Sequence, residues 1–300
     1  MAQMIAPFPY VGGKRRIASL VWESFGSPNA YIEPFGGSLA ILLGAPTRSS
    51  SEIVNDANHF VTNFWRALRA DWKGVLDLAR DPVTEVDYKA RHLWLVTEGL
   101  RLLDGLDMVT DPDAHDVRVA AWWAWGQSVS IGRWCLPGSD PDGVVNGLNQ
   151  RPTMDTSTGI MGPNMSVMLE RLAERLHEVR VLSGSWERCI TDGMIYRNTP
   201  CAVFLDPPYR PHLRDRRLYG ASSESAKPMA INDDIEAWCR DRGSDPRLRI
   251  VLAGLEGEYD LPDWRQVSWR APSASSDNRD AERLWLSPHC IAPSAQEKLF

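Results

Sequence analysis

The fold is decided by the stretch Ala30-Tyr31-Ile32-Glu33-Pro34-Phe35-Gly36-Gly37-Ser38 and the apolar residues 39–43 after it. Residues 30–33 are of strand type, residues 34–38 form a turn with two glycines, and residues 39–43 are compatible with a helix. A second short strand, Ile53-Val54, ends at Asn55-Asp56. A strand, a helix and a further strand in this order predict a parallel sheet with helical layers.

The same pattern returns in the second half of the chain. Strand-type runs occupy residues 180–182, 201–205 and 249–253, with a helical segment at residues 233–239 before the last run. Residues 267–269 and 284–286, on either side of a polar loop, predict an antiparallel hairpin that closes the sheet. The expected fold class is therefore α/β, with a Rossmann-like, mostly parallel sheet.

Residues 59–178 separate these two α/β portions and differ from them in character. Their periodicity predicts helices at residues 63–78, 88–103 and 117–127. Residues 136–164 are crowded with Gly, Pro, Asn, Asp and Ser, which is typical of a binding loop. We predict one domain made of residues 1–58 and 179–300, with residues 59–178 inserted into it as a mainly helical domain.

Composition indicates a globular protein of 300 residues, 43% of them hydrophobic and 24% charged. The five cysteines have irregular spacings without a CxxC pair or a histidine cluster, which favours a reducing compartment and argues against a zinc site. No apolar stretch approaches the roughly 18 to 20 residues of a membrane span, and the N-terminus lacks a signal-peptide core. A cytoplasmic protein of a bacterial or virus-infected cell is expected.

The net charge of -6 disfavours nucleic-acid binding in general, because Lys and Arg neutralise phosphates. Basic residues nevertheless cluster at residues 14–16 and again at residues 210–217. Such runs are more often solvated surfaces than binding sites. Their positions beside the two motifs described next favour a binding role for them.

The motif Asp206-Pro207-Pro208-Tyr209 follows the apolar run at residues 201–205. It is compatible with a proline-stiffened turn, but it also offers what an amine-methylating enzyme needs. The Asp206 carboxylate and the Pro207 carbonyl can accept both hydrogens of an exocyclic base amine, and so draw its nitrogen toward tetrahedral geometry. The flat ring of Tyr209 can stack on an extruded base. Catalysis would consist of orientation and electrostatics, with direct methyl transfer.

The N-terminal portion offers a place for a methyl donor. Glu33 stands at a strand end before the glycine turn, where a ligand can approach the backbone closely at the carboxyl edge of a parallel sheet. Asp56 stands at the next strand end, a position suited to a carboxylate that accepts ribose hydroxyls. Each signal alone is weak, because two glycines after a strand are more often only a turn.

Four motifs together resemble a known enzyme family. They are Pro7-Phe8-Pro9-Tyr10-Val11-Gly12-Gly13-Lys14, the segment Glu33 to Ser38, Asn55-Asp56 and the tetrapeptide at residues 206–209. Their order is similar to that of the α group of D12-class, Dam-like DNA adenine-N6 methyltransferases, in which the target-recognition region lies between the donor motifs and the tetrapeptide. Residues 283–288 also resemble the closing hairpin of that family.

The resemblance implies methylation of the adenine N6 amino group in specific sequences of double-stranded DNA. It implies base flipping and S-adenosyl-L-methionine as the donor. The sequence leaves the oligomeric state open, with a monomer or a weak dimer as the expectation. The residues Asp206, Pro207, Pro208 and Tyr209 would hold the flipped adenine. The implied donor site comprises Tyr10, Gly12, Gly13, Lys14, Asp56 and Asp206, in a pocket shaped by Glu33, Pro34, Phe35, Gly36 and Ser38.

Two positions depart from the family pattern. Tyr10 stands where many relatives carry Trp, which is a mild aromatic exchange. The segment Ser183-Gly184-Ser185-Trp186 lacks the acidic residue that often follows the glycine of that strand. The second departure suggests a weakened wall of the donor or adenine pocket.

The inserted block is expected to read the DNA sequence. The polar side chains able to pair with base edges in the major groove are Arg133, Asn146, Asn149, Gln150 and Arg151. The arginines suited to phosphates around the extruded nucleotide are Arg210, Arg214, Arg216 and Arg217. Trp122, Trp123 and Trp125 are expected in a small core rather than as base-stacking platforms, whereas for Trp134 both interpretations stay open.

Several alternatives remain beside adenine methylation. Cytosine-N4 methylation needs the same two acceptors and the same stacking ring. A catalytically weak DNA-binding relic, an RNA base and a protein amide are further possibilities, although related glutamine methyltransferases carry Asn in place of Asp206. Pro200-Cys201 invites comparison with cytosine-C5 methyltransferases, but Cys201 opens an apolar strand, and its expected burial excludes that chemistry.

Overall fold

The structure confirms the predicted strand, turn and helix at residues 30–43. This computed structural model describes residues 4–10, 12–130, 134, 160, 164–210, 227–270 and 282–292. Strand β1 (Ala30–Glu33) is buried along its whole length, and the short helix α2 (Ala40–Leu43) follows the glycine turn. Strand β2 (Ser51–Asp56) pairs with β1 in parallel, with Ile32 opposite Ile53. The predicted opening of the sheet is therefore present.

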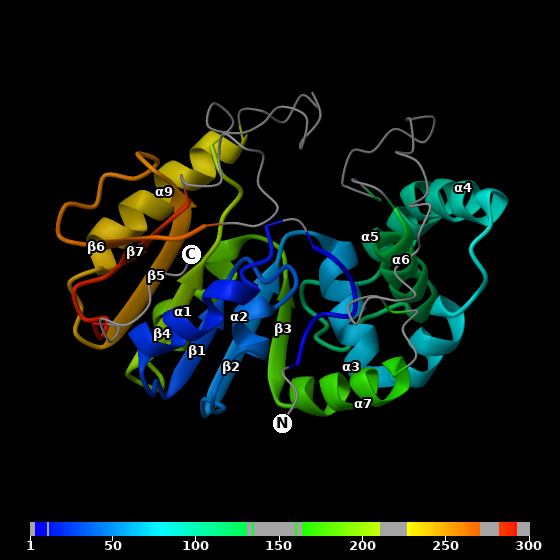
Figure 1. Ribbon diagram of the computed structural model, residues 1–300, viewed down its shortest axis with the longest axis horizontal. Helices are drawn as coiled ribbons and strands as arrows, with labels where there is room; N and C mark the ends of the chain where they lie inside the picture. Colours follow the sequence, from blue (N-terminus) through cyan, green and yellow to red (C-terminus); the bar gives the residue numbers. More distant parts are fainter. Residues whose placement is uncertain are drawn as a thin grey trace. The chain divides into compact units, whose positions relative to one another are not determined.

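Seven strands form one sheet in the order β3-β2-β1-β4-β5-β7-β6 (Figure 1). The other strands are β3 (Val179–Ser183), β4 (Cys201–Leu205), β5 (Leu248–Leu255), β6 (Arg265–Ser268) and β7 (Glu282–Leu286). Strand β4 is parallel to β1 and to β5, whereas β7 is antiparallel to β5 and to β6. The expected α/β class, with a mostly parallel sheet and a closing hairpin, is confirmed.

The strand order reverses between β1 and β4. Strand β2 lies on one side of β1, while β4 and then β5 continue on the other side. In open α/β sheets, ligands bind beyond the carboxyl ends of the strands at such a reversal, because the two connections leave in opposite directions and open a crevice. Strand β1 ends at Glu33, and β4 ends at Leu205, directly before Asp206. Two of the predicted site segments therefore begin at the reversal.

Contacts divide the chain into two compact units. The helical unit comprises Met1–Tyr10 and Asn55–Ser185, and the sheet unit comprises Val11–Val54 and Trp186–Phe300. The sheet unit holds β1, β4, β5, β6, β7 and most of β2. We predicted that residues 59–178 form an inserted target-recognition domain. This prediction includes a role in DNA recognition, which contacts within the chain do not test, so it stays a prediction.

The helical unit contains the helices that periodicity predicted. Helix α3 (His59–Ala79) packs against α6 (Val117–Val129) and α7 (Met165–Leu176). Helix α4 (Glu85–Trp94) continues through a π-helical turn at Leu95–Gly99 into α5 (Leu100–Gly105). The side chains of Asn58, Thr84 and Asp116 accept backbone N–H groups at the starts of α3, α4 and α6. These caps explain why the helices begin where they do.

The tryptophans of α6 form a core, as expected. Trp123 and Trp125 are buried, and the Trp123 ring lies 4.9 Å from that of Phe8. Trp122 is partly exposed and packs edge-on against Trp94. Trp134 is also fully buried, and a Cβ atom added to Gly126 would collide with its ring. Base stacking by Trp134, which the sequence left open, is therefore excluded in this arrangement, because no face of its ring reaches the surface.

Besides α2, the described part of the sheet unit contains three further α-helices. Helix α1 (Ala18–Phe25) follows a 3-10 turn at Arg15–Ile17, α8 (Asp192–Ile195) is short, and α9 (Lys227–Arg242) contains the predicted helical residues 233–239. Among the described residues, no helix has the combined length and apolar character that crossing a bilayer requires.

Candidate active site

The tetrapeptide lies directly beyond the carboxyl end of the buried strand β4. The Asp206 side chain keeps 21% of its surface exposed, Pro207 is buried and Pro208 is exposed. The Asn232 side-chain amide donates a 2.9 Å hydrogen bond to the Pro208 carbonyl. This bond holds the backbone of the motif on α9. Within the described residues, no hydrogen bond is made to the Pro207 carbonyl.

Lys14 joins the N-terminal motif to the tetrapeptide. Its ammonium lies 2.9 Å from Asp206 Oδ1 and donates to the Gly12 carbonyl at 2.9 Å. Lys14 is only 4% exposed, so the ammonium of the ion pair is shielded from solvent. Burial raises the pKa of Asp206 above its usual value, and the charge of Lys14 opposes that rise. The pair thus keeps a carboxylate with raised basicity at the strand reversal.

Two aromatic rings flank the same ammonium. Lys14 Nζ lies 5.2 Å from the ring centroid of Tyr209 and 5.8 Å from that of Trp269. These distances allow cation–π attraction, which is strengthened by burial. Trp269, just after β6, was not among the predicted site residues, because a tryptophan beside a strand carries no local sign of a distant lysine.

Two glutamates support the tetrapeptide, Glu282 on β7 and Glu258 in the loop after β5. The Tyr209 hydroxyl donates a 2.6 Å hydrogen bond to Glu282 Oε2 on β7. The backbone N–H of Arg210 donates to Glu258 Oε1 at 2.6 Å, and that of Leu255 donates to Glu258 Oε2 at 2.8 Å. Burial, together with these negative charges, raises the pKa of Tyr209 well above its usual value. The Tyr209 hydroxyl therefore stays protonated and keeps its bond to Glu282.

Glu33 supports the glycine turn. Its carboxylate is buried and accepts hydrogen bonds from the Tyr31 hydroxyl at 2.9 Å and from the backbone N–H of Leu42 at 3.3 Å. It therefore ties β1 to α2. Gly37 has φ 48° and Leu39 has φ 53°, so the turn passes twice through the left-handed region. Glycine adopts that conformation freely, whereas leucine is strained in it.

The other residues of this turn lie around Glu33. Pro34 and Gly36 are buried, and Phe35 and Ser38 are half-buried. The Phe35 ring stacks against Trp186, with centroids 6.4 Å apart and an interplanar angle of 22°. Gly12 and Gly13 are exposed, and Gly12 has φ 80°. The sheet unit thus contains nearly all of the predicted donor-site residues.

Tyr10 and Asp56 belong to the helical unit. The Tyr10 ring lies 6.2 Å from that of Phe8. Asp56 Oδ1 accepts the Asn58 backbone N–H at 2.8 Å, and the Asp56 carbonyl accepts that of Gly184 at 3.1 Å. Asp56 is therefore held at the end of β2 with its carboxylate half-buried. The predicted contacts of Tyr10 and Asp56 with the donor stay predictions.

Of the residues predicted to contact DNA, Arg210 is the one that lies within the described part of the chain. The Arg210 guanidinium is 12% exposed and pairs with Asp233 at 2.7 Å and with Glu236 at 3.4 Å. A phosphate would have to compete with these carboxylates, and the predicted contact of Arg210 with DNA stays a prediction. The other arginines and amides named for DNA lie outside the described residues, namely Arg133, Asn146, Asn149, Gln150, Arg151, Arg214, Arg216 and Arg217.

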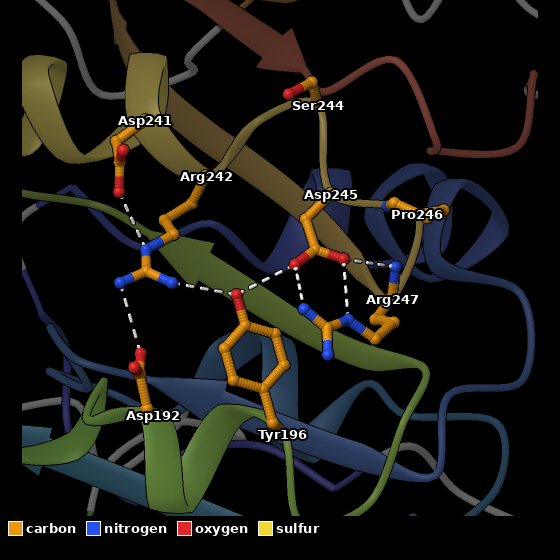
Figure 2. A pocket seen from close by; sticks show the side chains of 8 residues that line it. All are labelled: Asp192, Tyr196, Asp241, Arg242, Ser244, Asp245, Pro246 and Arg247. Atoms are coloured by element: carbon orange, nitrogen blue, oxygen red, sulfur yellow. Dashed lines mark hydrogen bonds and ion pairs between the residues drawn. The ribbon is translucent and has the colours of Figure 1, made fainter.

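A pocket before the amino ends of β4 and β5 is lined largely by charged side chains that pair with one another (Figure 2). The Tyr196 hydroxyl donates to Asp245 Oδ2 at 2.9 Å and accepts a 3.0 Å bond from Arg242. Arg247 binds Asp245 through two nitrogens, and its guanidinium lies 4.1 Å from the Tyr196 ring centroid. These residues precede β4 and β5 rather than follow them. The groups satisfy one another, which indicates a structural role.

Cys201 is confirmed as a buried strand residue. It is 0% exposed at the start of β4, and burial raises the pKa of its thiol to about 12. A cytosine-C5 methyltransferase requires an accessible thiolate, so that chemistry is excluded for Cys201.

Comparison with known families agrees with this geometry. Residues 10–90 match the model of the D12 class N6 adenine-specific DNA methyltransferases. Over residues 10–90 the chain is therefore similar to a class of transferases that methylate adenine in DNA. The resemblance to the D12 class that the motifs carried is thereby confirmed over residues 10–90, which include Lys14, Glu33 and Asp56. No curated protein matches the chain.

Proposed function

We propose that this enzyme methylates the N6 amino group of adenine in specific sequences of double-stranded DNA, after flipping the base out of the duplex. The observation that carries the proposal is the place of Asp206. Its carboxylate follows β4 at the strand reversal, remains partly exposed and is paired with buried Lys14. A ligand at the carboxyl edge of the sheet would meet this group first.

The chemistry of these residues fits S-adenosyl-L-methionine as donor, which supplies a methyl group on a positively charged sulfonium. A cationic ligand is favoured by carboxylates, and Asp206 offers one at the reversal. Gly36 and Gly37 bring the backbone close to the same edge. The buried carboxylate of Glu33 keeps this turn in shape through its bonds to Tyr31 and Leu42. Asp56, at the end of β2, would accept ribose hydroxyls.

The tetrapeptide would orient the amine. Lys14 contacts Asp206 Oδ1, so Oδ2 would accept one N6 hydrogen and the Pro207 carbonyl the other. These two bonds draw the nitrogen toward tetrahedral geometry, while Tyr209 stacks on the adenine ring. A nitrogen–carbon bond forms as the carbon–sulfur bond breaks, and the nitrogen then releases one proton. Asp206 is placed to receive that proton, because burial has raised its pKa.

Residues outside the sheet unit would also bind the DNA. In the proposed arrangement, residues 59–178 form the target-recognition domain, with Arg133 and Arg151 at base edges. Arg210, Arg214, Arg216 and Arg217 would contact phosphates around the flipped nucleotide. The enzyme would act in the cytoplasm, as a monomer or a weak dimer.

The test is to express the protein in a host without DNA methylation and to identify the modified nucleosides in digested DNA. Single-molecule sequencing of the same DNA gives the target site. N6-methyladenine is expected with the wild type and is expected to disappear with Asp206→Ala and Asp206→Asn, while both variants keep a cooperative unfolding transition. Asp260→Ala serves as the matched control, because Asp260 is 82% exposed and pairs only with surface Arg240 among the described residues.

Other outcomes would decide against the proposal. N4-methylcytosine as the sole product would replace adenine by cytosine as the target. Methylation that persists unchanged in Asp206→Ala would exclude this carboxylate from the site. DNA binding without any methylated base would identify a relic that has lost catalysis.

A further inference from the structure

Glu282 holds the tyrosine of the tetrapeptide from a distant strand. Its Oε2 accepts the Tyr209 hydroxyl at 2.6 Å, and the residue is 7% exposed. Glu282 itself is fixed on two sides. It pairs with Leu255 in the ladder between β5 and β7, and its carbonyl accepts the Trp269 backbone N–H at 3.2 Å. The backbone that carries this carboxylate is therefore held in place.

This bond restricts the ring of Tyr209. A tyrosine side chain turns about two torsions, and a short bond from a hydroxyl to a carboxylate is among the stronger hydrogen bonds in proteins. The Lys14 ammonium lies 5.2 Å from the centroid of the same ring. Lys14, Tyr209 and Glu282, which we call the ring clamp, thus fix the hydroxyl and one flank of the ring.

A purely structural role does not account for the clamp. Burying a carboxylate is costly, and Glu282 is placed beside two further carboxylates, Asp206 and Glu258, with Lys14 as the opposing charge. An apolar side chain that packed under the Tyr209 ring would stabilise the fold at lower cost. A buried acceptor aimed at the hydroxyl provides something that apolar packing cannot, namely a defined orientation of the ring.

We propose that Glu282 is a positioning residue, which sets the plane of the Tyr209 ring and thereby the orientation of the base stacked on it. The inference rests on the proposed function, because the base is the ligand of that ring. Glu282 does not touch the base. Its loss therefore lowers kcat through a misoriented amine, while KM for DNA changes little because the phosphate contacts are untouched.

The experiment compares Glu282→Ala, Glu282→Gln, Tyr209→Phe and the double variant Tyr209→Phe/Glu282→Ala. Steady-state kinetics on an oligonucleotide with the sequenced target site gives kcat and KM. A loss of ~10- to 100-fold in kcat is expected for Glu282→Ala, the size typical of small misplacements. Glu282→Gln keeps an acceptor oxygen and should recover most of this loss. The double variant should lose no more than the worse single variant, because both remove the same bond.

Two further readouts separate positioning from general damage. With 2-aminopurine at the target adenine, Glu282→Ala should give brighter emission than the wild type, because poor stacking on Tyr209 quenches the extruded base less. Without DNA, NMR of labelled tyrosine rings should show faster flipping of the Tyr209 ring in Glu282→Ala. Glu256→Gln is the control, because the Glu256 side chain is 65% exposed and pairs with Arg283 rather than with Tyr209.

The inference is overturned if Glu282→Ala changes only KM, if the two single losses add in the double variant, or if the ring flips equally fast in all variants. If Glu282→Ala does not fold, Tyr209→Phe and Glu282→Gln carry the same comparison. A wild type that makes no N6-methyladenine would overturn the proposed function, whereas the ring-flip measurement, made without DNA, would still decide whether Glu282 positions Tyr209.

Discussion

The Lys14 ammonium lies 2.9 Å from Asp206 Oδ1, although the two residues come from distant parts of the sequence. One precedes the first helix of the sheet unit and the other follows β4. The pair joins a motif expected at the donor to a motif expected at the adenine. Because Lys14 is buried, its charge acts on Asp206 with little screening.

Replacing Lys14 by Met should move the pH dependence of catalysis. Burial raises the pKa of Asp206 and Lys14 lowers it, so removal of Lys14 raises that pKa further. The reaction needs the ionised carboxylate as acceptor, so the acid limb of kcat/KM should shift to higher pH. Activity at neutral pH should fall by about 10-fold or more. An acid limb at the same pH in Lys14→Met and wild type would contradict the effect of Lys14 on the pKa of Asp206. Lys89→Met is the control, because Lys89 forms an exposed pair with Glu85.

Replacing Gly37 by Ala should strain the turn after β1. Gly37 has φ 48°, where a Cβ atom costs about 1 to 2 kcal/mol. The free energy of unfolding in denaturant should fall by about that amount, and the Kd for S-adenosyl-L-methionine measured by calorimetry should rise. Gly193→Ala in α8 is the control, because an added Cβ there meets nothing within 4 Å. Equal stability and equal donor affinity in both variants would refute the role of the turn.

Replacing Cys201 by Ala should leave the reaction intact. The thiol is buried in β4, so its removal leaves a small cavity and lowers the free energy of unfolding by about 1 kcal/mol. N6-methyladenine should form at close to the wild-type rate. Loss of all activity in a folded Cys201→Ala variant would reopen covalent catalysis by this thiol.

Replacing Asp245 by Asn should weaken the fold without affecting catalysis. Asp245 accepts hydrogen bonds from Arg247 and Tyr196, and the bond from Arg247 holds the pKa of its carboxyl well below the usual value. A depressed pKa means that the stabilisation is present above the unfolded pKa of about 4 and is lost as pH falls through the lower folded pKa. At pH 7 the variant should lose about 1 to 3 kcal/mol of unfolding free energy.

The pH dependence provides the check on Asp245. In denaturant unfolding, the difference in the free energy of unfolding between wild type and Asp245→Asn should be large at pH 7 and smaller in acid. Asp241→Asn should be close to neutral at both values, because Asp241 is 71% exposed. A gap that widens in acid would show that Asp245 is not the stabilising carboxylate.

Local patterns account for much of what could be predicted. The strands at residues 30–33 and 201–205 are short apolar runs bounded by turn residues, and both were recovered with the same bounds. Helices α1 and α7 were missed. In α7, the buried residues Leu169, Leu172 and Leu176 do have helical spacing, so a readable signal was present. In α1, the buried residues Ala18, Val21, Trp22 and Phe25 have helical spacing as well, so a readable signal was present there too.

The sequence by itself determined the parallel sheet and the motif residues Lys14, Asp206 and Tyr209, because short apolar runs and short motifs are encoded within a few neighbouring positions. Only the tertiary structure decided that Glu282 and Trp269 join them. A glutamate at the start of a strand and a tryptophan at the end of another show no local preference for a distant tyrosine or lysine. Their contacts arise from the pairing of β6 with β7 and of β7 with β5, which joins segments that are distant in the sequence.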